Sequence, residues 1–166
     1  TLIHERDFSR ALAISIDHEY YGELYSFGDT QEGLQYLDPT KAHTKRMKEM
    51  GLWDKYMEMY QSYDIEKANE LLDGLGLAKG EGGWRYLPSG KRVEISILTR
   101  TGSKDEWNFK AAEDVEKNLG IKVWVEAFAK AGMMERLNAG DYMYWGRQQG
   151  SRSPFITFDP TLDYSW

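Results

Sequence analysis

The feature that most constrains the fold of this chain is a change in hydrophobic spacing after Leu87. Before Leu87, apolar residues recur every three or four positions, as they do on one face of a helix. After it, short runs alternate apolar and polar residues, as strands do, and longer helical runs separate them. We therefore predict an α/β chain, in which a helical first half packs on a small mixed, largely parallel sheet.

Three strands and two connecting helices are expected in the second half. Val93–Thr99 and Ile121–Phe128 alternate apolar and polar residues, and Asp141–Gln148 is an aromatic third strand. The helix Lys104–Leu119 has a capping box at its start and a glycine stop, and a short helix covers Lys130–Asn138. Right-handed crossovers through these helices would make the strand pairing largely parallel.

The first half is expected to be mainly helical. One helix is predicted over Ile3–Tyr21, an irregular loop over Ser26–Pro39, and a second helical stretch over Thr40–Ser62 that Gly51 can divide in two. A third helix should begin at the N-cap Asp64 and end before a C′ glycine, Gly76. Trp84–Leu87 should then form a hairpin with Val93–Thr99, because Pro88, Ser89 and Gly90 are typical turn residues.

Composition argues against several classes of function. There are 21 Lys and Arg residues against 27 Asp and Glu, so the net charge is −6 and offers no basic surface for nucleic acid or an anionic membrane. The chain has no cysteine, which rules out disulfides, thiolate metal sites and cysteine nucleophiles within it. No apolar run approaches the roughly 20 residues that a membrane-spanning helix needs.

No motif in the sequence indicates catalysis or a cofactor. The histidines His4, His18 and His43 are isolated and lack metal-ligand spacing. The glycines before Lys91 do not have the spacing of a phosphate-binding loop, and no nucleophile elbow or acid/base pair is present. We therefore expect no catalytic residue, no metal, no cofactor and no enzymatic turnover.

The candidate binding site is the end of the aromatic third strand. There, bulky rings run directly into small and amide-bearing residues, and ligands in open α/β sheets bind at the carboxyl ends of strands. Aromatic faces can stack on a sugar ring, while Gln and Arg can bond its hydroxyls. The alternative is that these rings are only the core of a central strand. The candidate residues are Tyr144, Trp145, Gly146, Arg147, Gln148 and Gln149.

Several segments, in the right order, resemble the family 5 extracytoplasmic solute-binding proteins of ABC importers. The Tyr-Asp-x-x-Lys-Ala segment that runs into a Gly-Trp-Arg sequence is fairly specific in this context, and the matching segments cover most of the chain. They are Arg6–Asp17, Tyr63–Thr99, Ala111–Glu126 and Arg136–Gly146, followed by Asp159 and Pro160.

This resemblance implies one lobe of a two-lobed clamp that closes on its ligand by hinge bending. We expect residues 1–166 to be a single domain, a ligand-binding lobe excised from a longer protein. The chain begins at Thr1 rather than Met, and the resemblance accounts for only one of the two lobes. The family also implies a location outside the cytoplasm, in the periplasm or at the cell surface with a signal or lipid anchor, and ABC permease subunits as partners.

The resemblance leaves the ligand open between oligosaccharide and oligopeptide. Peptide-binding members place an Asp shortly after the Trp-Gly strand, where it captures the peptide amino group. Here Arg147, Gln148 and Gln149 follow, and the next acid is Asp159. We therefore favour an oligosaccharide, with Trp145 as the stacking platform. A stand-alone carbohydrate-binding module and an enzyme domain of unknown chemistry remain the alternative functions.

Overall fold

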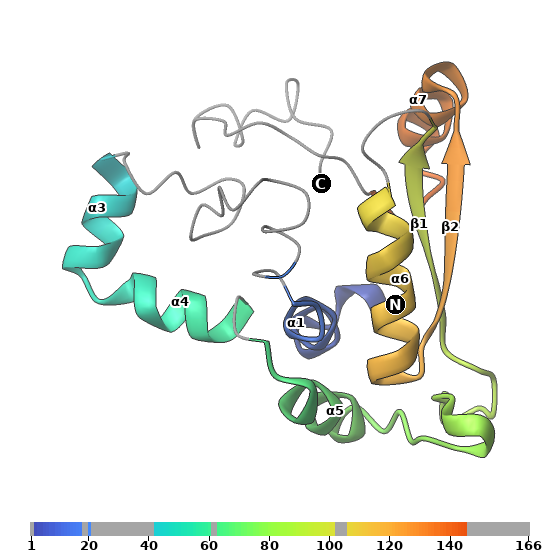
Figure 1. Ribbon diagram of the computed structural model, residues 1–166, viewed down its shortest axis with the longest axis horizontal. Helices are drawn as coiled ribbons and strands as arrows, with labels where there is room; N and C mark the ends of the chain where they lie inside the picture. Colours follow the sequence, from blue (N-terminus) through green and yellow to red (C-terminus); the bar gives the residue numbers. More distant parts are fainter. Residues whose placement is uncertain (1, 18–19, 21–41, 61–62, 102–105, 146–166) are drawn as a thin grey trace. The chain divides into compact units, whose positions relative to one another are not determined.

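The computed structural model describes residues 2–17, 20, 42–60, 63–101 and 106–145 (Figure 1). The chain divides into two compact units. Unit 1 consists of Thr1–Asp17 and Tyr63–Arg147, and unit 2 of His18–Ser62 and Gln148–Trp166. The loop predicted over Ser26–Pro39 lies outside the described residues.

Unit 1 is an α/β structure, as the change in hydrophobic spacing predicts. In chain order, its elements are η1 (Leu2–His4), α1 (Arg6–Ile14), α5 (Ile65–Gly74), η2 (Glu81–Gly83), β1 (Glu94–Arg100), α6 (Glu106–Leu119), β2 (Lys122–Phe128), α7 (Lys130–Ala139) and β3 (Tyr144–Trp145).

The described sheet of unit 1 is parallel throughout and has the strand order β2-β1-β3. In the register, Ile97 of β1 lies opposite Val125 of β2 on one side and Tyr144 of β3 on the other. This confirms the prediction of a small, largely parallel sheet with helical crossovers. The predicted capping box at the start of α6 includes Ser103, which lies outside the described residues.

The two crossover helices pack on opposite faces of the sheet. One core joins α1, α5 and α6 to the face that carries Ile95 and Val123. A second, smaller core packs Met133 and Leu137 of α7 against Leu98 on the other face. Figure 1 shows α7 beside the carboxyl-terminal ends of β1 and β2. Alternate side chains of β1 therefore enter different cores: Ile95 and Ile97 face α6, whereas Leu98 is the apolar residue of β1 that faces α7.

Helix α1 ends earlier than the expected helix over Ile3–Tyr21. It stops at Ile14, where the hydroxyl of Ser15 donates a hydrogen bond to the carbonyl of Leu12 at 2.9 Å. The carbonyls of Ile14 and Ser15 accept hydrogen bonds from the backbone N–H of Asp64 and the side-chain amide of Asn118, both at 2.9 Å. These partners from other elements replace the helical bonds that a longer α1 would need.

The capping signals of α5 are confirmed. The Asp64 carboxylate accepts a hydrogen bond from the backbone N–H of Lys67 at 2.8 Å, so it caps the first turn. At the other end, Gly76 has a φ of +75° and donates to the carbonyl of Asp73, while Leu77 donates to that of Leu72. This pair of bonds is the Schellman arrangement, which a C′ glycine permits.

The predicted hairpin before β1 is reduced to its turn and isolated bridges. Gly90 donates to the carbonyl of Leu87 at 2.8 Å, which closes the expected turn. Across that turn Tyr86 bridges to Arg92, and the backbone N–H groups of Leu87 and Val93 donate to the carbonyls of Lys91 and Arg85, both at 2.8 Å. β1 itself pairs with β2 and β3. The backbone N–H of Arg85 instead donates to Gly120, between α6 and β2.

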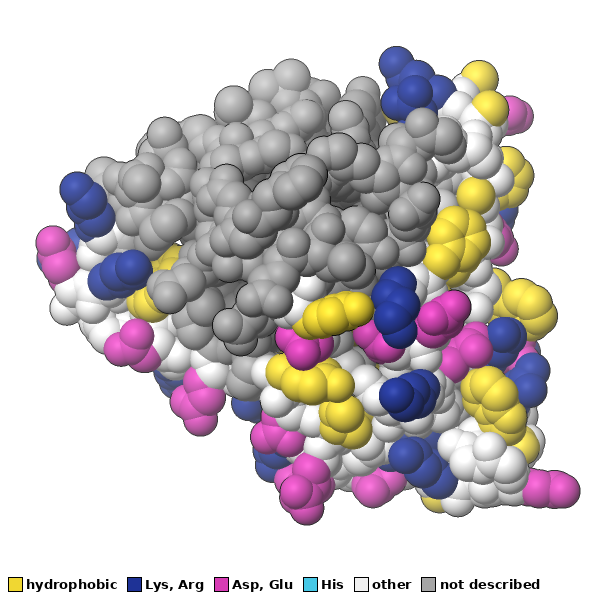
Figure 2. All heavy atoms as spheres, in the orientation of Figure 1, with side chains coloured by type: hydrophobic (Ala, Val, Ile, Leu, Met, Phe, Trp, Pro, Cys, Tyr) yellow, Lys and Arg dark blue, Asp and Glu magenta, His cyan; other side chains and the backbone are white. Residues whose placement is uncertain are grey.

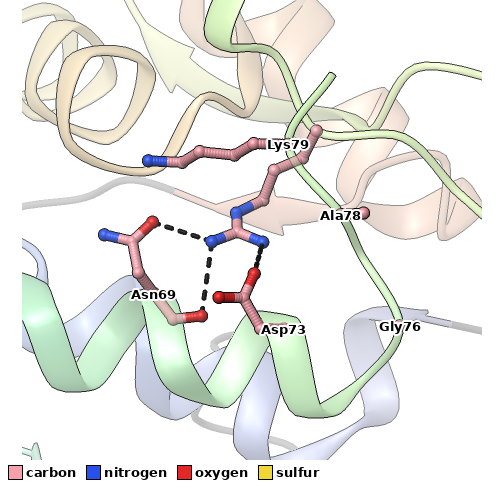
Figure 3. A pocket seen from close by; sticks show the side chains of 6 residues that line it. Asn69, Asp73, Gly76, Ala78 and Lys79 are labelled. Carbon is pink, nitrogen blue, oxygen red and sulfur yellow. Dashed lines mark hydrogen bonds and ion pairs between the residues drawn. The ribbon is translucent and has the colours of Figure 1, made fainter.

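The side chain of Arg85 fastens α5 to the end of α6. It is 0% exposed, and its guanidinium donates to the Leu119 carbonyl at 3.0 Å and to the Leu77 carbonyl. It also bonds the Asp73 carboxylate at 2.6 Å and the Asn69 side-chain oxygen at 2.7 Å, and these last two bonds are drawn in Figure 3. All of its nitrogens are therefore engaged within unit 1.

Unit 2 contains, among its described residues, α3 (Ala42–Glu49) and α4 (Leu52–Tyr60). Gly51 separates them with a φ of +67°, which confirms that the glycine divides the predicted helix Thr40–Ser62. The ammonium group of Lys48 lies 4.8 Å from the ring centre of Trp53, whose side chain is buried.

Replacing Arg85 by Met should destabilise unit 1 by at least about 3 kcal/mol, because several buried carbonyl and amide oxygens lose their donor at once. The matched control is Arg92→Met: Arg92 forms an exposed ion pair with Glu94, so its loss should cost about 1 kcal/mol or less. Urea unfolding of both variants measures the difference. Equal losses of unfolding free energy would show that the buried hydrogen bonds of Arg85 stabilise unit 1 no more than the exposed ion pair of Arg92 does.

Replacing Asp64 by Ala should cost about 1 kcal/mol, because the first turn of α5 loses its side-chain acceptor. Asp64→Asn keeps an acceptor oxygen at the same place and should retain most of the stability. The comparison uses thermal unfolding at neutral pH. If Asn is as damaging as Ala, the cap acts through its charge rather than through the hydrogen bond.

Candidate functional site

The structure describes part of the predicted binding segment. Tyr144 and Trp145 form β3, which lies parallel to β1 with Trp145 opposite Leu98. The strand is shorter than the predicted Asp141–Gln148, because its first residues have no strand pairing. The other four candidates, Gly146, Arg147, Gln148 and Gln149, lie outside the described residues.

The parallel sheet places the carboxyl ends of its strands at a common edge. β1 ends at Arg100, β2 at Phe128 and β3 at Trp145. The backbone N–H of Thr101 donates to the carbonyl of Phe128 at 2.8 Å, so the first two strands remain joined at this edge. Ligands in open α/β sheets bind at this carboxyl edge.

A mostly apolar pocket of about 230 Å³ lies beside Tyr144 within unit 1. Its walls come from α1, β1 and α6, and Tyr144 is its only described residue from β3. The Tyr144 hydroxyl is buried and has no hydrogen-bond partner among the described residues. Burial raises the pKa of this phenol, and the nearby Ser9 hydroxyl offsets part of the rise. The lining includes Leu12, Ile16, Ile95, Ile97, Ala111 and Val115.

A buried polar pair joins the end of β1 to the first turns of α6. The side-chain amide of Asn108 donates to the hydroxyl of Thr99 at 2.9 Å, and both residues are buried. Asn108 also lines the pocket beside Tyr144. This pair was not among the predicted site residues, although the sequence carries a signal for it: Asn108 falls on the same helical stripe as the apolar Ala112 and Val115.

Arg136 of α7 holds the segment that leads into β3. Its guanidinium donates to the Asp141 carboxylate at 3.0 Å and to Glu126 of β2 at 2.5 Å. The hydrogen bond to Asp141, together with the charge of Glu126, raises the pKa of Arg136 above its ordinary value. Gly140, with a φ of +68°, turns the chain between Arg136 and Asp141. Arg136 was not predicted as a site residue, because only the fold brings its partners together.

A second cavity, of about 460 Å³, lies between α5 and the segment that precedes η2 (Figure 3). Asn69, Asp73, Lys79 and Arg85 line it. Because Arg85 is already bonded through all of its nitrogens, it has no free donor for a ligand. We interpret this cavity as part of the framework of unit 1.

The described surface carries charges of both signs. Figure 2 shows Lys and Arg side chains among Asp and Glu on the face in view. At the β2 edge, away from β3, the exposed Trp124 donates from its indole N–H to Glu94 at 3.1 Å. None of the described helices is long and apolar enough to cross a membrane. Within the same residues, no three acidic or histidine side chains cluster to hold a metal ion.

Solved structures with the same fold include oligopeptide-binding and periplasmic binding proteins. No family model matches the chain. The oligopeptide-binding protein OppA is 25% identical, with a TM-score of 0.64, over 83% of this chain and 20% of its own. A periplasmic oligopeptide-binding protein of Thermotoga maritima, solved with bound mannohexaose, is 27% identical with a TM-score of 0.69, over 82% of this chain and 25% of its own.

A third similar structure is the periplasmic binding protein MelB from Agrobacterium fabrum C58 in complex with stachyose. It is 19% identical with a TM-score of 0.66, over 89% of this chain and 22% of its own. The chain therefore spans about a fifth to a quarter of the length of the structures that it matches. Its fold is that of a part of the family 5 solute-binding proteins, which confirms the resemblance seen in its sequence.

Proposed function

We propose that residues 1–166 form one ligand-binding lobe of a longer solute-binding protein, which captures an oligosaccharide or oligopeptide outside the cytoplasm for an ABC importer. The observation that carries this proposal is the place of β3. β3 lies in a parallel sheet and runs toward the carboxyl edge of that sheet. The chain shares its fold with an oligopeptide-binding protein and with a protein solved with a bound sugar.

A single lobe supplies half of a cleft, so tight binding requires closure by a second lobe. A ligand loses translational and rotational freedom when it binds, and its contacts with the protein must offset this loss. One lobe alone provides about half of those contacts, so its affinity for the ligand should be low. In this proposal the chain binds its ligand without converting it. The complete protein delivers the ligand to permease subunits from the periplasm or from the cell surface.

The ligand class rests on the sequence rather than on the similar structures. Those structures include proteins with mannohexaose and stachyose as well as one with a nonapeptide. We favour an oligosaccharide because Arg147, Gln148 and Gln149 follow the aromatic strand, where an acid would be needed for a peptide amino group. Amide and guanidinium groups can bond several hydroxyls of a sugar, and Trp145 supplies a ring for stacking.

The binding proposal is tested by calorimetric titration of the complete protein with mannohexaose, stachyose and a nonapeptide. For the ligand that binds, Trp145→Ala should weaken affinity by about 2 kcal/mol or more, as truncation of a buried aromatic anchor does. Arg147→Ala should weaken it as well. The control is Trp124→Ala, an exposed tryptophan on the opposite edge strand, which should leave affinity unchanged.

Unchanged affinity in both the Trp145 and Arg147 variants would mean that the aromatic strand is only core. Titration of residues 1–166 alone separates the lobe from a stand-alone carbohydrate-binding module. The lobe should bind far more weakly than the complete protein, whereas a module would bind equally well. Hydrolysis of the sugar or peptide during the titration would instead support an enzyme.

A further inference from the structure

Arg136 joins the segment that enters β3 to the end of β2. Its guanidinium donates to the Asp141 carboxylate at 3.0 Å and to the Glu126 carboxylate of β2 at 2.5 Å. The guanidinium carbon lies 5.1 Å from the ring centre of Phe128, the last residue of β2. One side chain therefore connects α7, the carboxyl end of β2 and the chain that leads to Trp145.

A second hydrogen bond ties Asp141 to the same residue. The backbone N–H of Asp141 donates to the carbonyl of Arg136 at 2.9 Å, after Gly140 turns the chain with a φ of +68°. The bond between guanidinium and carboxylate is the stronger of the two, because both of its partners are charged. Arg136 therefore holds both the backbone and the side chain of Asp141.

The strand ladder does not hold the segment that enters β3. Tyr144 and Trp145 pair with Ile97 and Leu98, whereas residues 141–143 have no strand pairing. A shift of register by one residue moves every side chain of a strand to the opposite face of the sheet. Such a shift would remove Tyr144 from the core that it packs against. An anchor ahead of Tyr144 fixes the register, and Arg136 supplies one.

We propose that Arg136 is a positioning residue for ligand binding, which acts through Asp141 to keep β3 in the register that the binding site requires. Arg136 touches no ligand in this role. Binding sites depend on supporting hydrogen bonds that hold the contact residues within about 0.5 Å of their binding positions. The inference rests on the proposed function, in which Trp145 contacts the ligand. It adds the residue that fixes the position of Trp145.

The two carboxylates explain why an arginine suits this position. Glu126 and Asp141 accept from different nitrogens of Arg136, Nη1 and Nε, whose directions are fixed by the planar guanidinium. A lysine ammonium group is a point charge on a flexible stem, so it would not fix the angle between the two partners. The Arg136 side chain is 27% exposed, so salt screens these bonds less than it screens a fully exposed pair.

Lys122 provides a matched control at the other end of β2. Its ammonium group bonds Glu116 at 2.6 Å, its side chain is 26% exposed, and it lies 4.9 Å from the ring centre of Trp124. Lys122 thus resembles Arg136 in burial, in ion pairing and in ring contact. It is the first residue of β2, however, and so lies at the amino edge of the sheet. A variant at Lys122 measures what losing such an ion pair does to stability alone.

The first measurement follows hydrogen exchange by mass spectrometry over residues 141–145 of the complete protein without ligand. Arg136→Met should speed exchange at these amides about tenfold, because Asp141 loses its anchor and the segment opens locally. Lys122→Met should leave the exchange rate within about twofold of that of the unmodified protein. Unchanged exchange in the Arg136 variant would overturn the proposal, and so would equal acceleration in both variants.

The second measurement is calorimetric titration of the complete protein with mannohexaose, stachyose and a nonapeptide. For the probe that binds, Arg136→Met and Asp141→Ala should each weaken affinity about tenfold, and the double variant should weaken it no further. Arg136→Lys should weaken affinity nearly as much, although it keeps the charge. Lys122→Met should bind as the unmodified protein does.

The outcomes separate this inference from the proposed function. If Trp145→Ala weakens affinity and Arg136→Met does not, only the positioning role of Arg136 is wrong. If the losses at Arg136 and Asp141 add in the double variant, the two residues act independently and the proposal is also wrong. If neither Trp145→Ala nor Arg136→Met changes affinity, the proposed binding site is wrong, and the inference that rests on it is wrong as well.

Discussion

The buried guanidinium of Arg85 is the interaction on which the rest of unit 1 depends. It bonds α5 through Asn69 and Asp73 and the end of α6 through Leu119, while its backbone bonds Gly120. α5 packs on α1, and α6 packs on the sheet, so one side chain connects both layers. A charged group is tolerated at 0% exposure because hydrogen bonds engage every nitrogen and a carboxylate balances its charge.

With these layers fixed, the sheet determines where its strands end. Three parallel strands end at one edge, and the buried pair of Asn108 with Thr99 joins α6 to β1 there. Arg136 holds Asp141, the residue from which the chain enters β3. The aromatic strand is thus positioned by contacts from both faces of the sheet. In the proposed function, closure moves whole lobes rather than individual strands.

The fold was largely predictable because its signals are local. The N-cap Asp64, the C′ glycine Gly76 and the break at Gly51 act through backbone geometry within a few residues, and the structure has all three. The candidate site was predictable only in part. Tyr144 and Trp145 form a strand as expected, but the burial of the Tyr144 hydroxyl and the hydrogen bonds of Arg136 depend on residues from other elements. Such pairings leave no periodic pattern in the sequence.

By itself the sequence determined the α/β class, the order of strands and helices and the resemblance to solute-binding proteins, since hydrophobic period and capping residues are local properties of the chain. Tertiary structure alone decided three other features: the end of α1 at Ile14, the reduction of the hairpin to a turn with an isolated bridge, and the burial of Arg85. In each case backbone or side-chain groups form hydrogen bonds with other elements. Those hydrogen-bond partners are distant in sequence, because a buried polar group bonds to whichever group the packed layers bring within reach.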